Sequence, residues 1–191
     1  MKKKLLVASA ATLSIGLALG AFAHSGAMGI VKERMDGMMV MGKSMKSIAM
    51  MVKGVKDYDA DTIKAAAAAI EKHSGENMTK LFPKGEKKQK VSVAKDEIWT
   101  NWEEFEALSM RLQILSQGLA ASADKGLSGA SDSMMGNSSM MGSGSMMGSG
   151  SMMSDSNMPT MEMMAGMSPN MIFPMIAGTC SSCHTKFRTE K

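Results

Sequence analysis

The chain is poor in the residues from which disulfide frameworks and sheets are built. Its 191 residues include two cysteines, four prolines, two tryptophans, one tyrosine and five phenylalanines. Because Cys180 and Cys183 stand three positions apart, a bond between them would not join distant parts of a fold. The only alternation that suits a strand is at residues 91–93, which is too short. These absences leave an all-α protein.

Long apolar runs are absent beyond the first 22 residues. The one long run follows three lysines and closes on Ala21-Phe22-Ala23, the order of a secretory signal peptide. A membrane anchor is the alternative, but polar residues and glycines interrupt the run. We therefore expect residues 1–23 to be cleaved, leaving residues 24–191 as one domain in the periplasm with no membrane contact.

The excess of basic residues is mostly a property of this leader. Removing its three lysines from the 22 basic residues leaves 19, against 18 acidic residues. A nearly neutral chain without a basic motif is not expected to bind nucleic acid. One lysine cluster, at residues 84–90, is expected in a solvated loop, where it could steer an acidic partner.

Four stretches have the apolar spacing of helices, at residues 29–53, 62–73, 95–123 and 170–189. Asp61 is the expected N-cap of the second stretch, which is rich in alanine. Four helices of this length, each with one apolar face, pack most simply as an antiparallel bundle whose core can host a cofactor.

Residues 126–169 do not fit the bundle. The unit Ser-Met-Met-Gly-Ser-Gly recurs there, beginning at Ser139 and Ser145 and less perfectly at Ser151. Glycine and serine on every flank predict a flexible, low-complexity insertion between the third and fourth helices. Its paired thioethers are soft ligands that suit Cu(I), and a mature chain beginning at His24 could chelate Cu(II). A linker, or a sink for oxidants, is the alternative.

The chemistry of the chain is concentrated in Cys180-Ser181-Ser182-Cys183-His184. This is the attachment signature of c-type haem. Helix positions three and four apart share a face, so both thiols can form thioethers at one edge of a haem while His184 ligates its iron.

Two other readings compete for these residues. A redox disulfide is expected in a βαβ setting, which this chain lacks. A structural zinc site needs four ligands, and the remaining histidines, His24 and His73, offer no second pair at ligand spacing.

With its terminal haem motif followed by Phe187-Arg188, the chain resembles the cytochrome c′ family, the class II cytochromes c. Residues 30–48 resemble the first helix of the family, in which an arginine precedes the distal residue by four positions. Leu81-Phe82-Pro83 and Ile98-Trp99 resemble its middle section. Met35 departs from the glutamine usual there, and the methionine-rich insertion has no counterpart.

The resemblance implies a four-helix protein with one covalent haem c. It places Met38 over the distal face of the iron, and it places Arg34 and Arg188 near the haem propionates. Arginine forks can hold carboxylates through charge-assisted bonds, although both residues could equally be solvated. The resemblance also implies that two bundles can pair as a homodimer.

The distal side decides the mechanism. If the Met38 sulfur binds iron, the haem is six-coordinate and the protein is a one-electron carrier serving periplasmic redox proteins. If Met38 only fills the core, the iron is five-coordinate and could bind nitric oxide or carbon monoxide. No arrangement of catalytic acid, base or nucleophile is present, so we expect a carrier and not an enzyme. Copper handling through the methionine-rich tract is a third hypothesis.

Overall fold

Four long helices dominate the computed structural model, which describes residues 26–85, 89–127 and 158–189. The long helices are α1 (Gly29–Val52), α2 (Ala60–Lys72), α5 (Trp102–Ser122) and α7 (Pro169–Phe187). The short elements are α3 (Glu76–Thr79), α4 (Glu97–Thr100), the 3-10 turn η1 (Ala123–Lys125) and α6 (Met161–Gly166). No strand occurs in the described ranges, where one isolated bridge joins Ala94 to Arg188. The predicted all-α four-helix bundle is confirmed.

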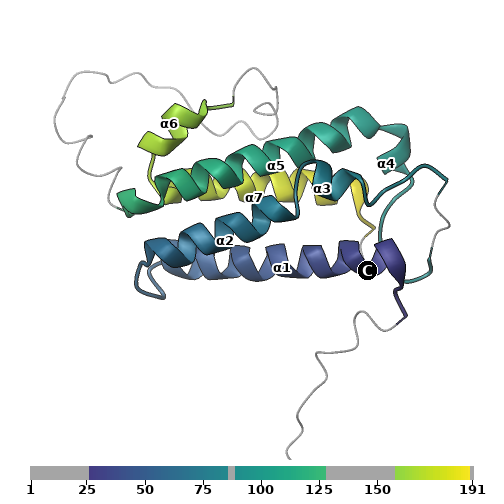
Figure 1. Ribbon diagram of the computed structural model, residues 1–191, viewed down its shortest axis with the longest axis horizontal. Helices are drawn as coiled ribbons and strands as arrows, with labels where there is room; N and C mark the ends of the chain where they lie inside the picture. Colours follow the sequence, from purple (N-terminus) through teal and green to yellow (C-terminus); the bar gives the residue numbers. More distant parts are fainter. Residues whose placement is uncertain (1–25, 86–88, 128–157, 190–191) are drawn as a thin grey trace, which may run out of the picture.

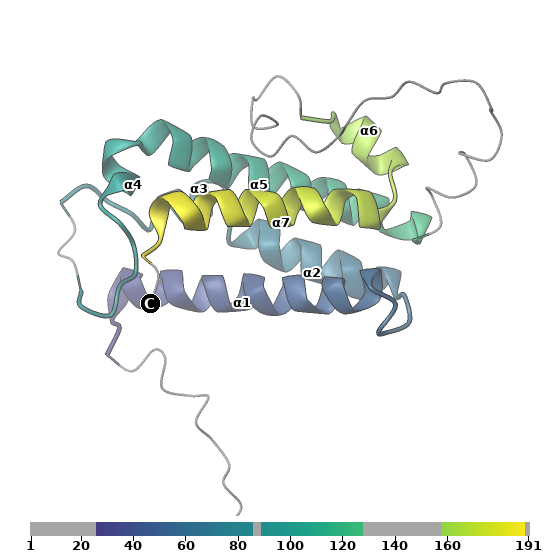
Figure 2. The ribbon, with the colours of Figure 1, turned by 180° about the vertical axis from the view of Figure 1, so that it is seen from behind.

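The long helices follow one another around the bundle in the order α1, α2, α5, α7. Figures 1 and 2 show α2 and α7 on opposite sides, with α1 along one edge and α5 along the other. Three neighbouring pairs pack extensively, whereas α1 and α7 touch much less. The C-terminal end of α7 lies beside the beginning of α1, so these two helices run antiparallel (Figure 1).

The core is built from the apolar stripes that the sequence predicts. On α1 the stripe includes Val31 and Ile48, which are fully buried, and on α5 it includes Leu115 and Leu119. Residues three and four apart lie on the same side of a helix, so each stripe turns one face toward its neighbours. Among the described residues, no helix is both long and apolar enough to cross a membrane.

Two predicted helix boundaries were wrong in detail. The second helix begins one residue before Asp61, because Asp59 is the N-cap and its carboxylate accepts a hydrogen bond from the Asp61 backbone N–H. The third stretch is not continuous: Asn101 leaves the helical conformation, with φ −118° and ψ 48°, and separates α4 from α5. The Trp99 indole on α4 donates to the carbonyls of Phe82 and Pro83, which fixes α4 against the preceding loop.

The end of the insertion is more ordered than predicted. Residues 128–157 lie outside the described ranges, as does the expected signal peptide, but residues 158–169 include α6. Thr160 caps α6 by accepting a hydrogen bond from the Met163 backbone N–H. The Met164 side chain is completely buried against α5, where Gly118 leaves room for it. Residues 161–166, which fall within the range predicted to be flexible, instead form a helix docked on the bundle.

Candidate functional site

The two cysteines occupy the core-facing stripe of α7. Ile172 and Ile176 are fully buried and Phe187 is 3% exposed, at spacings that mark one face of the helix. Cys180 and Cys183 fill the positions between Ile176 and Phe187, and both are half-buried at the edge of the core. The helix thus presents two thiols, one turn apart, on the side that faces the bundle.

Both thiols are neutral at physiological pH. Burial raises the pKa of Cys180, and burial together with the nearby Cys180 raises the pKa of Cys183 to about 11. The thiolate is the reactive form in disulfide exchange, so burial disfavours that chemistry here. Both cysteines are free in the structure.

His184 lies at the side of α7 and is exposed. Partial loss of water around its ring lowers the pKa of His184, and the positive charge of Arg188 lowers it further. The ring is therefore neutral above mildly acidic pH, and a neutral imidazole has a nitrogen lone pair that can bind a metal.

A cluster of aromatic rings links α1 to α7. The Arg34 guanidinium on α1 lies 4.3 Å from the centre of the Phe82 ring, and Phe82 packs edge-on against Phe105 at 4.8 Å. Phe105 in turn packs against Phe187 of α7 at 5.5 Å. Two rings therefore connect Arg34, near the beginning of α1, with Phe187 at the end of α7, and these helix ends lie side by side in Figure 1.

Counting inward from these neighbouring helix ends gives Met38 and the cysteine and histidine pair corresponding positions on α1 and α7. Each residue advances a helix by about 1.5 Å, and the two helices are antiparallel. Four positions forward from Arg34 lead to Met38, and four positions back from Phe187 lead to Cys183, the neighbour of His184. The same height on the two helices therefore carries a thioether, a thiol and an imidazole.

Met38 also lies on the appropriate side of α1. Gly37, its neighbour, faces α2, because a Cβ placed there would lie 3.0 Å from Nδ1 of His73. Successive helix residues are about 100° apart, so Met38 is turned away from this contact. Its side chain is half-buried and packs against the core. Met38 therefore lies on a different flank of α1 from the one that meets α2.

These donors fit a haem better than a bare metal ion. In the described ranges no group of three His, Cys, Asp or Glu side chains could hold a metal by itself. Two neutral thiols beside an imidazole match a group that is attached to α7 and ligated by it. The sparse packing of α1 against α7 suits a flat group between the two helices. The donor set therefore fits haem c.

The two arginines predicted near the propionates have different surroundings. Arg34 is 7% exposed and stacks on Phe82. Arg188 is exposed just after α7, where its backbone N–H donates to the His184 carbonyl. Their contact with propionates stays a prediction.

Sequence reasoning missed the segment that ties the two site helices together. The Gln89 side chain donates to the Met28 carbonyl at 3.1 Å and accepts from the Met28 N–H at 3.3 Å, which anchors the start of α1. A few residues later the Val93 carbonyl accepts from the Thr189 N–H at 2.8 Å, just beyond α7. No sequence signal marks these contacts, because they are made by ordinary loop residues.

Comparison with known sequences gives relatives of one kind. A sequence model of the family described as Cytochrome C' matches residues 29–141, a range that ends before Cys180. Cytochrome c-556 of Agrobacterium fabrum is 30% identical over 135 residues, which cover 70% of this chain and 88% of that protein. Cytochrome c-556 of Agrobacterium tumefaciens strain B2A is 38% identical over 81 residues, and the match spans 42% of this chain and only 64% of that relative.

Solved structures agree on the fold. Cytochrome c' from Rhodopseudomonas palustris superposes with a TM-score of 0.57 at 19% identity, covering 86% of this chain and 99% of that one. A nitric oxide complex of a mutant cytochrome c prime from Alcaligenes xylosoxidans superposes with a TM-score of 0.56 at 21% identity, covering 85% and 94%. At this level of identity the likeness concerns the architecture alone.

Proposed function

The chain belongs to the cytochrome c′ family of haem c-type cytochromes, and from that premise we propose that it is a periplasmic carrier of single electrons and not an enzyme. One haem c is attached through Cys180 and Cys183, with His184 on one side of the iron and Met38 on the other. Arg34 and Arg188 interact with the propionates. Its partners are periplasmic redox proteins, and two bundles can associate as a homodimer.

The observation that carries this proposal is the antiparallel packing of α1 and α7, from which counting along the two helices gives Met38 and His184 a common height. A bound haem supplies a one-electron iron couple and the vinyl groups to which thiols add. The chain supplies the rest: Cys180 and Cys183 fix the group to one face of α7, and the neutral imidazole of His184 offers its lone pair. A thioether from Met38 favours the reduced state and raises the potential, which suits a carrier.

Gas binding is the second candidate. It is favoured by the half-buried position of Met38, since an unbranched methionine can swing aside more easily than a fully packed side chain. A mutant cytochrome c prime from Alcaligenes xylosoxidans, which has the same fold, was solved as a nitric oxide complex. Copper handling has no comparable support, because most of the methionine-rich tract lies outside the described residues.

Absorption spectra of the purified holoprotein separate the two candidates. For a carrier with Met38 on the iron, the ferrous spectrum is unchanged by carbon monoxide, whereas Met38→Ala binds the gas and has a lower reduction potential. Met45→Ala is the matched control, because Met45 is also half-buried on α1 but lies about 10 Å further along the helix. Immediate binding of carbon monoxide by the wild type would establish the gas-binding alternative instead.

Attachment and export are tested on the same preparation. The intact mass should exceed that of the polypeptide by one haem, and the mature chain should begin at His24. Replacing both Cys180 and Cys183 with alanine should remove the covalent haem. A secreted wild-type protein without this added mass would refute the proposed site.

A further inference from the structure

The C-terminal part of α1, from residue 37 onward, carries positive charge on its outward face and no negative charge of its own. Residues 37–56 contain four lysines and no aspartate or glutamate. Lys43, Lys46 and Lys53 are exposed, and at about 100° per residue they fall within one narrow sector of the helix. The buried residues of α1, such as Met41 and Ile48, lie on the opposite side.

These lysines have no ion-pair partner among the residues that the structure describes. Within the described parts of the chain, salt bridges involve other lysines, such as Lys32, which pairs with Asp36 one turn before the stripe begins. The side chains of Lys43, Lys46 and Lys53 form no hydrogen bond or ion pair with any described residue. A helix that only needed solvation would usually intersperse charges of both signs on its exposed face.

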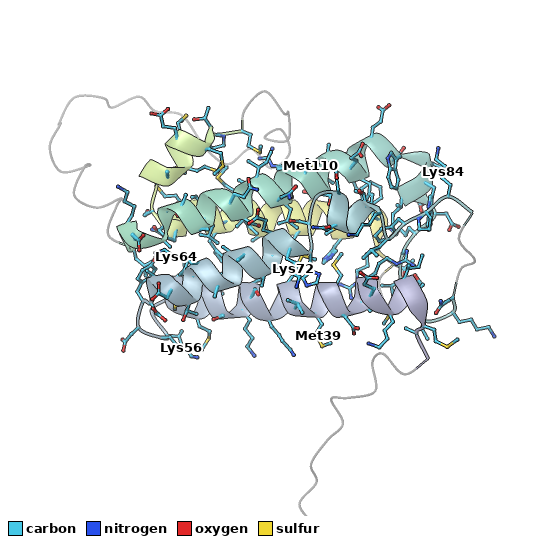
Figure 3. The ribbon with its side chains drawn as sticks, viewed as in Figure 1. Met39, Lys56, Lys64, Lys72, Lys84 and Met110 are labelled. Atoms are coloured by element: carbon cyan, nitrogen blue, oxygen red, sulfur yellow. The ribbon has the colours of Figure 1, made fainter. Side chains whose placement is uncertain are left out.

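Apolar side chains lie among the lysines. Met39 is 41% exposed and Val40 is 37% exposed. Figure 3 shows Met39 pointing away from the other helices. A small apolar centre bordered by charge is the usual anatomy of a protein interface, in which the rim steers and the centre packs.

We propose that this surface, formed by Met39, Val40, Lys43, Lys46 and Lys53, is the docking site for an acidic redox protein. The proposal rests on the carrier function proposed above and names the kind of partner. Charge complementarity selects the partner, because three unpaired lysines attract a surface rich in carboxylates. The surface is also close to the proposed haem site, because Met39 adjoins Met38 in the sequence and a helix is only about 10 Å across. A partner seated here is one helix diameter from the Met38 thioether.

Binding can be measured without electron transfer. The probe is an oxidised plant-type [2Fe–2S] ferredoxin of negative net charge, titrated into the ferric holocytochrome at low ionic strength by calorimetry. The variant carries Lys43→Gln, Lys46→Gln and Lys53→Gln. Its matched control carries Lys80→Gln, Lys84→Gln and Lys90→Gln, which remove the same charge from exposed positions on α3 and the following loop.

The α1 variant should bind the ferredoxin about tenfold more weakly, and its Kd should depend less on salt. The control should lose no more than about threefold. Stopped-flow reduction by the reduced ferredoxin should slow by the same ratio at low salt. Equal losses in the two variants, or no loss in the α1 variant, would overturn the docking site. A larger loss in the control would place docking at the loop lysines.

Other occupants of this face give different results. If phosphatidylglycerol vesicles bind the wild type and not the α1 variant, while ferredoxin binding is equal in both variants, the surface is a membrane contact and the proposal is wrong. If sedimentation velocity shows a dimer that only the α1 variant loses, again with equal ferredoxin binding, the face pairs two copies. Voltammetry of the wild type tests the carrier function separately, because a haem that does not cycle refutes that function whatever the ferredoxin affinity.

Discussion

The effect of Gly118→Ala on the free energy of unfolding should change sign when the side chain of Met164 is removed. Gly118 lies inside α5, where Met164 of α6 packs into the space that a side chain would fill. A Cβ at this position would lie 2.5 Å from the Met164 sulfur and 2.9 Å from its Cβ. Rotation of the flexible end can relieve the first contact, but only a shift of α6 relieves the second.

Two terms of opposite sign set the size of the effect. Alanine in place of a glycine inside a helix stabilises by about 0.5–1 kcal/mol. Displacing the fully buried Met164 loses about 1.5–3 kcal/mol of burial. We therefore expect Gly118→Ala to destabilise the wild type by about 1 kcal/mol. In a Met164→Gly background both the sulfur and the Cβ that would contact the new methyl group are absent, so the same substitution should stabilise by about 0.5–1 kcal/mol.

Urea unfolding of the holoprotein, followed by circular dichroism, gives the four free energies of this cycle. Gly42→Ala is the control, because Gly42 is exposed inside α1 and a Cβ there meets nothing within 4 Å. It should stabilise both backgrounds alike. If Gly118→Ala stabilises the wild type as much as Gly42→Ala does, then Met164 does not dock α6 on α5 and the reasoning fails.

Two further predictions concern the N-cap of α2 and the turn between α2 and α3. Gly75→Ala should lower the free energy of unfolding by about 3 kcal/mol, because Gly75 has φ +61° and its Cβ would lie 2.1 Å from the Gln113 amide oxygen; urea denaturation measures the loss. The hydrogen bond from the Thr62 hydroxyl lowers the pKa of Asp59 in the folded protein below its ordinary 3.8. The ionised Asp59 therefore contributes its full stabilisation above pH 3.8, and this stabilisation is lost as pH falls through the pKa of the folded state. Asp59→Asn should reduce the loss of stability as pH falls below 3.8, and an unchanged pH dependence would contradict this cap.

The long helices could be predicted because their signal is local and repeated. The apolar spacing of α1 predicts residues 29–53, and the observed helix is Gly29–Val52. Spacing of this kind records which face is buried, whatever the partner. The end of α7 was predicted within two residues for the same reason.

Elements that depend on a single distant contact were not predictable. The six residues of α6 are too few to form a helix alone, and they are held by Met164 in the notch at Gly118, more than forty positions earlier. A glycine within a helix pattern reads as a weak point in the sequence, and only the structure shows it to be a packing site. The break at Asn101 is similar, because the Trp99 contacts that accompany it involve the loop at Phe82.

The same distinction between local sequence signals and distant contacts applies to the candidate site. The spacing of Cys180, Cys183 and His184 within one helix is complete in five consecutive letters, so the sequence alone predicts where a haem is attached. Whether Met38 faces that group depends on the register of two helices that barely touch. That register is set at their ends, by Gln89 against the chain before α1 and by the Val93 carbonyl against the chain after α7. Since loosening either end would change what stands opposite His184 without touching the attachment motif, attachment and coordination should be separable by mutation.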